Sequence, residues 1–236
     1  MNIIDYAIIL FFGLSILLGM YHGSVATVLN LLGAALSLLI ARLCYPFATE
    51  WIAGHEKWME YLVYFSEGSS HIPTAMMEYA RADVTTLTAE QVQSVIAASG
   101  FTAPYDAVLL RNIADQVYAG QCTTLFEYFD QTVADYSLNA ISFLTTFAFT
   151  YLVCSLLIRL IDFTFTFPLL KCFDSVAGGV LGAARGFLGM MLLALLVPLV
   201  LNMLQIGLIE ELVEGSALLK PFYPDNWFFS WIRSTI

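Results

Sequence analysis

Residues 173 to 193 read FDSVAGGVLGAARGFLGMMLL, an apolar segment that contains one acid, one base and five glycines. On a helix, small residues at alternating steps of four and three form one stripe without large side chains, here Ser175, Gly179, Gly182, Gly186 and Gly189. In lipid the hydrophobic effect does not draw helices together, so such a stripe favours close backbone contact with another helix. The sequence therefore predicts a glycine zipper, with five packing residues: Gly178, Gly179, Gly182, Gly186 and Gly189.

The composition of the whole chain indicates an integral membrane protein. Of its 236 residues, 59% are hydrophobic and only 12% are charged, with a mean hydropathy of +0.78, whereas soluble domains carry roughly 25% charged residues. The net charge is −10, and the nine Lys and Arg residues are scattered singly. Because a phosphate backbone needs clustered basic residues, this pattern excludes nucleic acid as a partner.

Four apolar segments are long enough to cross a membrane as helices. The first two, at about 3–20 and 24–43, are separated only by Tyr21, His22 and Gly23, so residues 1–45 are expected to form an antiparallel hairpin. A second hairpin is expected over 139–205, with spans at about 140–161 and 176–201. The predicted fold class is all-α, with four transmembrane helices in two hairpins.

Residues 46–138 are predicted to be an acidic, helical, extracytoplasmic insert. Its first part is rich in aromatic residues, including Trp51, Trp58, Tyr61, Tyr64 and Phe65, as is typical of a membrane interface. Thr88 and Gln91 have capping-box spacing, with Gly100 as the stop of that helix. Thr102 and Pro104 are expected to open a second helix, whose apolar face is Val108, Leu109, Ile113 and Val117 and which ends at Gly120. Residues 122–136 read as a third helix, with Leu125, Phe129 and Val133 on its buried side.

Charge predicts the topology. Residues 45–137 contain twelve acids against Lys57, Arg81 and Arg111, whereas the short connection after the third span carries Arg159 and Lys171. The positive-inside rule therefore places that connection in the cytoplasm, and the insert and both termini outside. Residues 206–236 contain Trp227, Phe228, Phe229 and Trp231 and are expected to form an interfacial tail.

Three polar residues of the apolar segments are the candidates for function: Asp5, Asp174 and Arg185. Asp174 and Arg185 share a helix face but are eleven residues, or about 16 Å, apart, so they cannot pair directly. Arg185 either handles an ion or substrate inside the bundle, or snorkels and marks the cytoplasmic boundary. Asp5 lies in the first helical turn, where a carboxylate meets the positive end of the helix dipole.

Motifs of catalysis are absent from the sequence. It lacks GxSxG, HExxH and a phosphate-binding loop, and His22, His55 and His71 are isolated. Cys44, Cys122, Cys154 and Cys172 show no metal-ligand spacing and are expected to be buried thiols. No catalytic residue, cofactor or metal is therefore predicted.

Two sequence blocks resemble the colicin V production protein (CvpA) family of bacterial inner-membrane proteins. The first is Ile4-Asp5-Tyr6-Ala7-Ile8-Ile9 with Gly23 after the first span, and the second is Asp174, Gly178, Gly182 and Arg185-Gly186. His22 and Ser175 stand where family members often have a basic residue. The resemblance covers roughly 1–45 and 139–205, with the insert as an elaboration. It implies a four-helix protein linked in some bacteria to colicin V production and envelope homeostasis, without an established activity.

The functional expectation is a non-enzymatic scaffold that supports toxin production, secretion or envelope homeostasis. Its expected partners are membrane lipid and either a second copy of the chain or other membrane proteins. The alternative is a small transporter or channel component with a polar path that involves Arg185, Asp174 and Asp5. An intramembrane enzyme is a third and weaker hypothesis, because no nucleophile with a base stands at a recognisable spacing.

Overall fold

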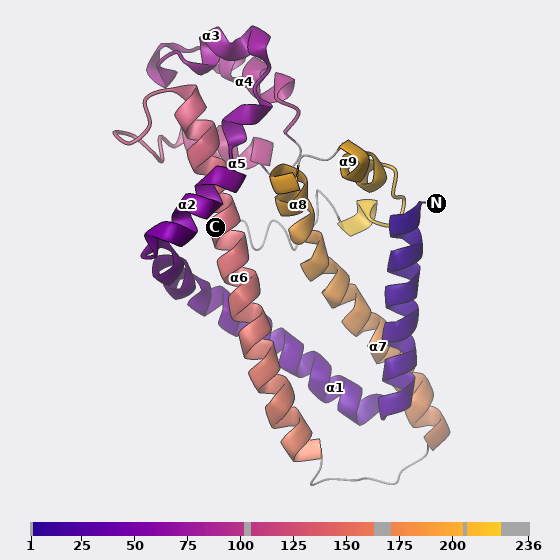
Figure 1. Cartoon of the computed structure of the whole chain (residues 1–236). Coiled ribbons are helices and arrows are strands. Elements are labelled where there is room, and N and C mark those ends of the chain that lie inside the picture. Colours follow the sequence, from indigo (N-terminus) through magenta and orange to yellow (C-terminus); the bar gives the residue numbers. More distant parts are fainter. Residues whose placement is uncertain (1, 102–104, 163–170, 205–206, 223–236) are drawn as a thin grey trace. The chain divides into compact units, whose positions relative to one another are not determined.

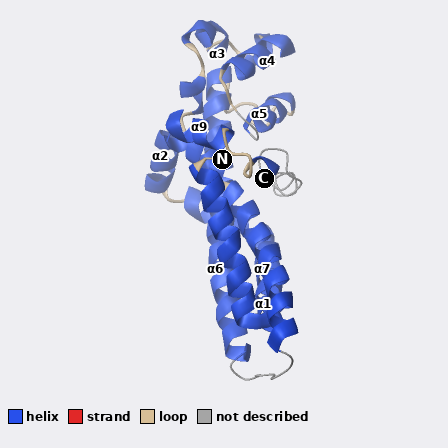
Figure 2. Ribbon diagram, turned by 90° about the vertical axis from the view of Figure 1, so that its right-hand side faces the viewer, coloured by secondary structure: helices blue, strands red, loops and turns tan. Residues whose placement is uncertain are grey.

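The computed structural model describes residues 2–101, 105–162, 171–204 and 207–222, and these residues fold almost entirely as helices (Figure 1). The α-helices are α1 (Ile3–Ala53), α2 (Glu56–Phe65), α3 (Met77–Ala80), α4 (Ala89–Ala98), α5 (Tyr105–Ala114), α6 (Leu125–Asp162), α7 (Lys171–Ala194), α8 (Leu196–Leu204) and α9 (Gly207–Glu214). Four short 3-10 helices join them, η1 (Gly68–His71), η2 (Thr74–Met76), η3 (Val84–Thr86) and η4 (Lys220–Phe222). Within these ranges the structure contains no strand, only two isolated β-bridges, so the predicted all-α class is confirmed (Figure 2).

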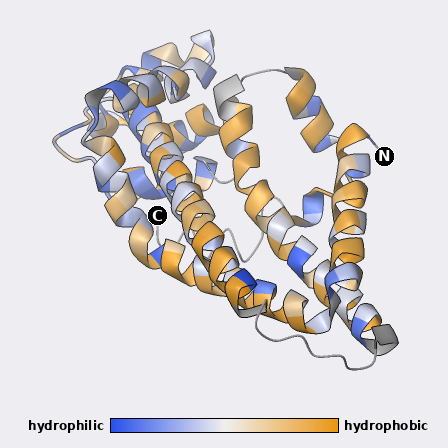
Figure 3. Cartoon of the chain, turned by 60° about the horizontal axis from the view of Figure 1, so that its bottom comes forward, coloured by the Kyte–Doolittle hydropathy of each residue, from blue (hydrophilic) through white to orange (hydrophobic). Residues whose placement is uncertain are grey.

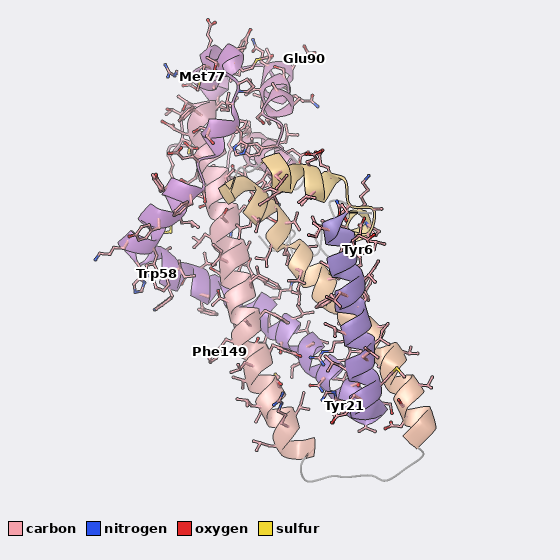
Figure 4. The ribbon with its side chains drawn as sticks, turned by 45° about the vertical axis from the view of Figure 1, so that its right-hand side comes forward. Tyr6, Tyr21, Trp58, Met77, Glu90 and Phe149 are labelled. Carbon is pink, nitrogen blue, oxygen red and sulfur yellow. The ribbon has the colours of Figure 1, made fainter. Side chains whose placement is uncertain are left out.

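Among the described residues, three stretches of helix are long and apolar enough to cross a membrane: Ile3–Ala53, Leu125–Leu160 and Asp174–Leu201. Figure 3 shows hydrophobic residues along most of the length of these helices. The shorter helices between α1 and α6 contain both hydrophobic and hydrophilic residues. Side chains such as those of Tyr6, Tyr21 and Phe149 project outward from these helices and are 63%, 86% and 68% exposed (Figure 4). An apolar exterior of this kind suits a lipid environment. The number of spans stays a prediction.

Helix α1 changes direction at one residue, Gly23. Gly23 has φ 81° and ψ 172°, and helical geometry resumes on both sides of it. The sequence predicts a turn over Tyr21 to Gly23, but Tyr21 and His22 are helical, and the break needs only the glycine. The halves on either side, of about 20 and 30 residues, are each ~30 Å long or more, the length that a membrane span requires.

The second half of α1 is longer than expected. The span is predicted to end near Leu43, and the helix itself continues through Pro46 to Ala53. A proline inside a helix removes one hydrogen bond and crowds the carbonyl four residues earlier. Good helix formers on both sides of Pro46, including Leu43 and Glu50, let the helix continue despite this local loss.

Proline has a clearer effect at the end of α7. The fourth span, predicted as one helix over 176–201, is interrupted at Leu195, between α7 and α8. Pro198 cannot donate to the carbonyl of Ala194, and its ring crowds that carbonyl. Leu195 instead donates to the Leu192 carbonyl at 3.2 Å, a tighter turn than an α-helix makes.

The described residues belong to two compact units. The first takes its residues from Met1–Ala48, Ile141–Leu196 and Ile206–Thr235, and the second from Thr49–Ala140 and Val197–Gln205. The second unit has its own core around α4, α5 and the start of α6, where Val95, Leu109, Leu125 and Phe129 are at most 1% exposed.

Several details of the insert follow the sequence pattern. The capping box of α4 is present, with Thr88 Oγ1 accepting from the Gln91 amide at 3.3 Å and Gln91 Oε1 accepting from the Thr88 amide at 2.8 Å. Gly100 follows the end of α4 with φ 69°. The predicted buried side of the third helix is confirmed, because Leu125, Phe129 and Val133 are fully or almost fully buried.

Two expectations for the insert are wrong. Helix α5 ends at Ala114, not near Gly120, and Val117 is 54% exposed because the chain turns there and its amide donates back to the Asn112 carbonyl. The helix that starts at Leu125 does not stop at residue 136 but runs on as α6 to Asp162. No glycine or proline separates the insert from the apolar segment, so nothing in the local sequence ends this helix. The proposed start at Thr102 and Pro104 lies outside the described residues.

A buried polar network joins α5 to α6 in the second unit. Tyr118 donates its hydroxyl hydrogen to Asp135 Oδ2 at 2.8 Å, and Asn112 Nδ2 lies within hydrogen-bond distance of both Tyr118 Oη and Thr132 Oγ1. Burial, together with the negative charge of Asp135, raises the pKa of Tyr118 above its ordinary value. The folded state therefore holds this phenol neutral more strongly than the unfolded state does.

This network predicts a stability that is lost at high pH. We expect Tyr118→Phe to lower stability by about 1 kcal/mol at neutral pH, the usual net value of a hydrogen bond. Because the folded pKa of Tyr118 lies above the unfolded value of about 10, the wild-type advantage is full below that value and shrinks as pH rises past it. Thermal unfolding followed by circular dichroism at several pH values between 8 and 11 measures this difference.

The matched control for this test is Tyr61→Phe, because Tyr61 lies in the same unit but is 66% exposed. We expect this variant to melt like the wild type at every pH. A Tyr118→Phe protein whose deficit stayed constant up to pH 11 would contradict the role given to the phenol proton.

Candidate functional site

The glycine stripe of α7 packs against the first half of α1 in the same chain. A Cβ atom placed on Gly182 would lie 2.5 Å from the Ser15 carbonyl oxygen and 3.2 Å from Gly19 Cα. A Cβ on Gly19 or Gly178 would overlap the carbonyl oxygen of the other residue. The two helices therefore cross backbone to backbone, with no room for side chains at the crossing.

The stripe extends on both sides of this crossing. A Cβ on Gly179 would lie 2.8 Å from Met20 Cγ, one on Gly186 would lie 3.1 Å from Ser15 Cβ, and one on Gly189 would lie 2.9 Å from Phe11 Cζ. The Ser15 hydroxyl also donates to the Gly182 carbonyl at 2.7 Å. All five glycines predicted as packing residues thus face helix α1, so an interface with a second chain would have to use another surface.

A carboxylate of α7 caps the second half of α1. Asp174 Oδ1 accepts hydrogen bonds from the Ser24 amide at 2.8 Å and from the Ser24 hydroxyl. The first amides of a helix have no partner inside the helix, and a negative charge there also meets the positive end of the helix dipole. Asp174 Oδ2 occupies the space where a Cβ of Gly23 would be. The Asp174 carboxylate therefore lies directly at the break in α1 and depends on the absence of a side chain at Gly23.

Asp5 fixes the chain near the start of α1. It is fully buried, and its Oδ1 accepts from the Ser216 hydroxyl at 2.6 Å and from the Leu218 amide at 3.1 Å. Its other oxygen accepts from the Asn2 amide at 2.9 Å. The sequence predicts a carboxylate at this helix N-terminus, but not its link to residues 216 and 218.

Arg185 has a neutral partner. Its Nη2 donates to the hydroxyl oxygen of Tyr151 on α6 at 2.8 Å. Among the residues that the structure describes, no Asp or Glu oxygen lies within 4.0 Å of its guanidinium. Counting from Lys171, Arg185 lies about 14 residues, or ~21 Å, along α7, so it stands well inside the apolar helix.

Arg185 and Tyr151 line a cavity of about 380 Å³, here called the Arg185 pocket. Its walls come from both halves of α1, from α6 and from α7, all within the first unit. Ser15 is the third polar side chain of the lining, and the rest of it is aliphatic, aromatic or glycine. Leu14 and Leu18 contribute to the wall and are about half exposed, at 51% and 50%. The pocket is thus an apolar space with one cationic side chain.

The three predicted polar candidates lie in three different places. Asp174 caps α1 and Asp5 binds residues 216 and 218, and neither of them lines the Arg185 pocket. Sequence reasoning missed their partners, which are Tyr151 for Arg185, Ser24 for Asp174 and Ser216 for Asp5. A hydroxyl in an apolar helix is a usable signal, because it needs a hydrogen-bond acceptor there.

The remaining candidates of the sequence form no site in the described ranges. No cluster of His, Cys, Asp and Glu that could hold a metal ion occurs there. The expectation of buried thiols is wrong for Cys44, which is exposed on α1, and Cys122 and Cys154 are partly exposed. The side chains of Asp162 and Cys172 and the tail from Trp227 lie outside the described residues.

The family model for "Colicin V production protein" matches residues 4–74 and 92–224, most of the chain. The chain belongs to the colicin V production protein family. No curated protein and no solved structure matches it. The matched residues of this colicin V production family protein include both blocks noted in the sequence, with Asp5, Gly23, Asp174, Gly182 and Arg185.

The family match also corrects the sequence analysis. The fixed motifs leave the insert outside the resemblance, but the match continues to residue 74 and resumes at residue 92. The start of α6, α5 and α4 from Val92 onward are therefore part of the colicin V production family pattern.

Proposed function

We propose that this protein is a non-enzymatic scaffold in the bacterial inner membrane that supports toxin production, secretion or envelope homeostasis. The family supports the general role, because colicin V production is its named process and it is not a known enzyme family. The observation that carries the scaffold role is the structural task of the residues in the second family block. Asp174, Gly178 and Gly182 all serve to hold α7 against α1, which makes a rigid helix pair and not a reactive group.

The membrane arrangement belongs to the same proposal. Four spans follow if the two halves of α1 cross separately, and the break at Gly23 supports this reading. The charge pattern then puts the insert and the termini outside the cytoplasm. The exposed aromatic residues of the α1–α2 region, including Trp51 and Trp58, support a position at the membrane interface. Their outward direction is visible for Trp58 in Figure 4.

Partner binding would then use surfaces outside the glycine stripe. The protein presents exposed apolar side chains on α6, such as Phe149 and Leu160, and an acidic insert with its own core. Membrane lipid, a second copy of the chain and other membrane proteins are the partners that these surfaces suit.

A secretion assay tests this role. In a bacterium that lacks its own family member, we expect the wild-type chain to restore colicin V secretion. We also expect it to crosslink to one reproducible set of membrane proteins in repeated experiments. Gly182→Leu should lose secretion and crosslinks together, because it separates the helix pair. Gly13→Leu is the matched control, since a Cβ on Gly13 has no atom within 4 Å, and it should retain both.

The transporter alternative keeps one supporting observation, the pocket around Arg185. In that case Arg185→Gln would abolish secretion while the crosslinked partners stayed the same. This result would contradict the scaffold proposal, because a scaffold fails through lost association.

A further inference from the structure

Among the described residues, the guanidinium of the Arg185 pocket has an acceptor for only a small part of its hydrogen-bonding capacity. Arginine has five N–H donors in a planar fork that matches a carboxylate or a phosphate. Here the structure gives one of them an acceptor, the hydroxyl of Tyr151. A charged side chain inside an apolar helix is costly at the centre of a bilayer, and pairing with an anion reduces that cost.

The rest of the pocket selects for a ligand with an apolar body. Apart from Ser15, Tyr151 and Arg185, its lining is apolar, with Ala34 and Leu38 of α1 on one wall and Leu188 of α7 on another. Its volume of about 380 Å³ is near the lower end of the range of roughly 300–1,000 Å³ for small-molecule pockets. It therefore suits one hydrocarbon chain and not two.

The position of the opening favours a ligand that arrives through lipid. Leu14 and Leu18 line the pocket and are half exposed, so the pocket has an accessible apolar surface on α1. In a membrane this surface faces acyl chains, so a small hydrophilic anion would have to cross hydrocarbon to reach Arg185. An amphiphile already dissolved in the bilayer meets no such barrier.

We propose that the Arg185 pocket binds one hydrocarbon chain of an anionic amphiphile, with the carboxylate or phosphate of this amphiphile at Arg185 and Tyr151 and the chain against the apolar walls. A free fatty acid and one acyl chain of an anionic phospholipid share this chemistry. The site is independent of the scaffold role, because it needs neither a protein partner nor secretion.

Native mass spectrometry of the full-length protein in a non-ionic detergent tests the site. The probes are oleate, phosphatidylglycerol and, as the neutral control, oleyl alcohol. We expect one bound oleate or phosphatidylglycerol per chain and weaker binding of the alcohol. Oleate alone identifies a fatty-acid carboxylate as the ligand, phosphatidylglycerol alone identifies a lipid headgroup, and binding of both supports the shared anionic chemistry.

Variants distinguish binding of the anionic probes in the pocket from non-specific attraction to other cationic side chains. Arg185→Gln should weaken binding roughly 10- to 100-fold, the value of a hydrogen bond to a charged group. Arg185→Lys, which keeps the charge but loses the fork, should have an intermediate affinity. Arg159→Gln is the matched control, because Arg159 is exposed on α6 and does not line the pocket, and it should bind like the wild type.

A second variant tests the apolar part without touching the charge. Ala34 is 8% exposed and lines the pocket, so Ala34→Leu fills part of the space and should also weaken oleate binding. Thermal melting of each variant in detergent establishes that it is folded. Equal binding of oleate by folded Arg185→Gln and wild type, equal binding of oleyl alcohol and oleate, or no binding of either anionic probe would overturn the proposal.

Discussion

Gly182→Leu is expected to destabilise the protein strongly, because it places a side chain at the crossing of α7 and α1. Its Cβ would lie 2.5 Å from the Ser15 carbonyl oxygen and 3.2 Å from Gly19 Cα, which are backbone atoms and cannot rotate aside. The hydrogen bond from Ser15 to the Gly182 carbonyl would be lost as α7 moves away. Overpacking typically costs about 1–3 kcal/mol, and a backbone contact puts this change at or above the upper value.

The measurement is thermal unfolding of the purified protein in a mild detergent, together with its native mass. A loss of about 3 kcal/mol lowers the midpoint by roughly 10 °C in a chain of this size. Gly13→Leu makes the same substitution in α1 at a position with open space, and we expect its midpoint to stay within a few degrees of the wild type.

The native mass separates two explanations of the glycine stripe. Because the stripe faces the chain's own α1, the single chain itself should lose stability in Gly182→Leu. A variant with the wild-type midpoint but a smaller native mass would show instead that the stripe joins two chains. That outcome would contradict the packing described here.

Gly23→Ala is also expected to lower the melting midpoint strongly, for two separate reasons. Gly23 has φ 81° and ψ 172°, a conformation that is essentially confined to glycine and costs a residue with a side chain about 1–3 kcal/mol. Its added methyl group would also collide with Asp174 Oδ2 and push away the carboxylate that caps Ser24. The break between the two halves of α1 would lose both its backbone geometry and the carboxylate that caps Ser24.

Gly100→Ala is a control for a substitution at a positive φ. Gly100 has φ 69°, and a Cβ added to it would have no atom within 4 Å, so this variant introduces strain without a collision. We expect the melting midpoint to fall further in Gly23→Ala than in Gly100→Ala. Equal effects would mean that Asp174 does not contribute at Gly23.

A double-mutant cycle isolates the carboxylate. In the background of Asp174→Ala the collision is removed, so Gly23→Ala should cost less there than in the wild type. Ser24→Ala combined with Asp174→Ala should likewise cost less than the sum of the single changes, because each of them removes the same hydrogen bond from the Ser24 hydroxyl to Asp174. Strict additivity in both cycles would argue against the cap.

Local patterns predicted the elements where one physical signal dominates. The composition and the length of the apolar segments indicated helices that could cross a membrane, because only a helix satisfies its own backbone in lipid. Thr88 and Gln91 predicted their capping box, and the spacing of Leu125, Phe129 and Val133 predicted their burial. Element ends were less accurate: α1 runs on to Ala53, beyond the span predicted to end near residue 43, and α6 continues past residue 136.

The site depended on contacts between residues far apart in the chain. The glycine spacing by itself determined that α7 needs a close helix neighbour, since small residues leave a groove on whichever face they share. Only the tertiary structure decided that this neighbour is the first half of α1, that Asp174 caps Ser24 across 150 residues, and that Arg185 meets Tyr151 beside an apolar pocket. The physical reason is that helical periodicity is a property of one segment, whereas a hydrogen-bond partner or a cavity is a property of how segments pack.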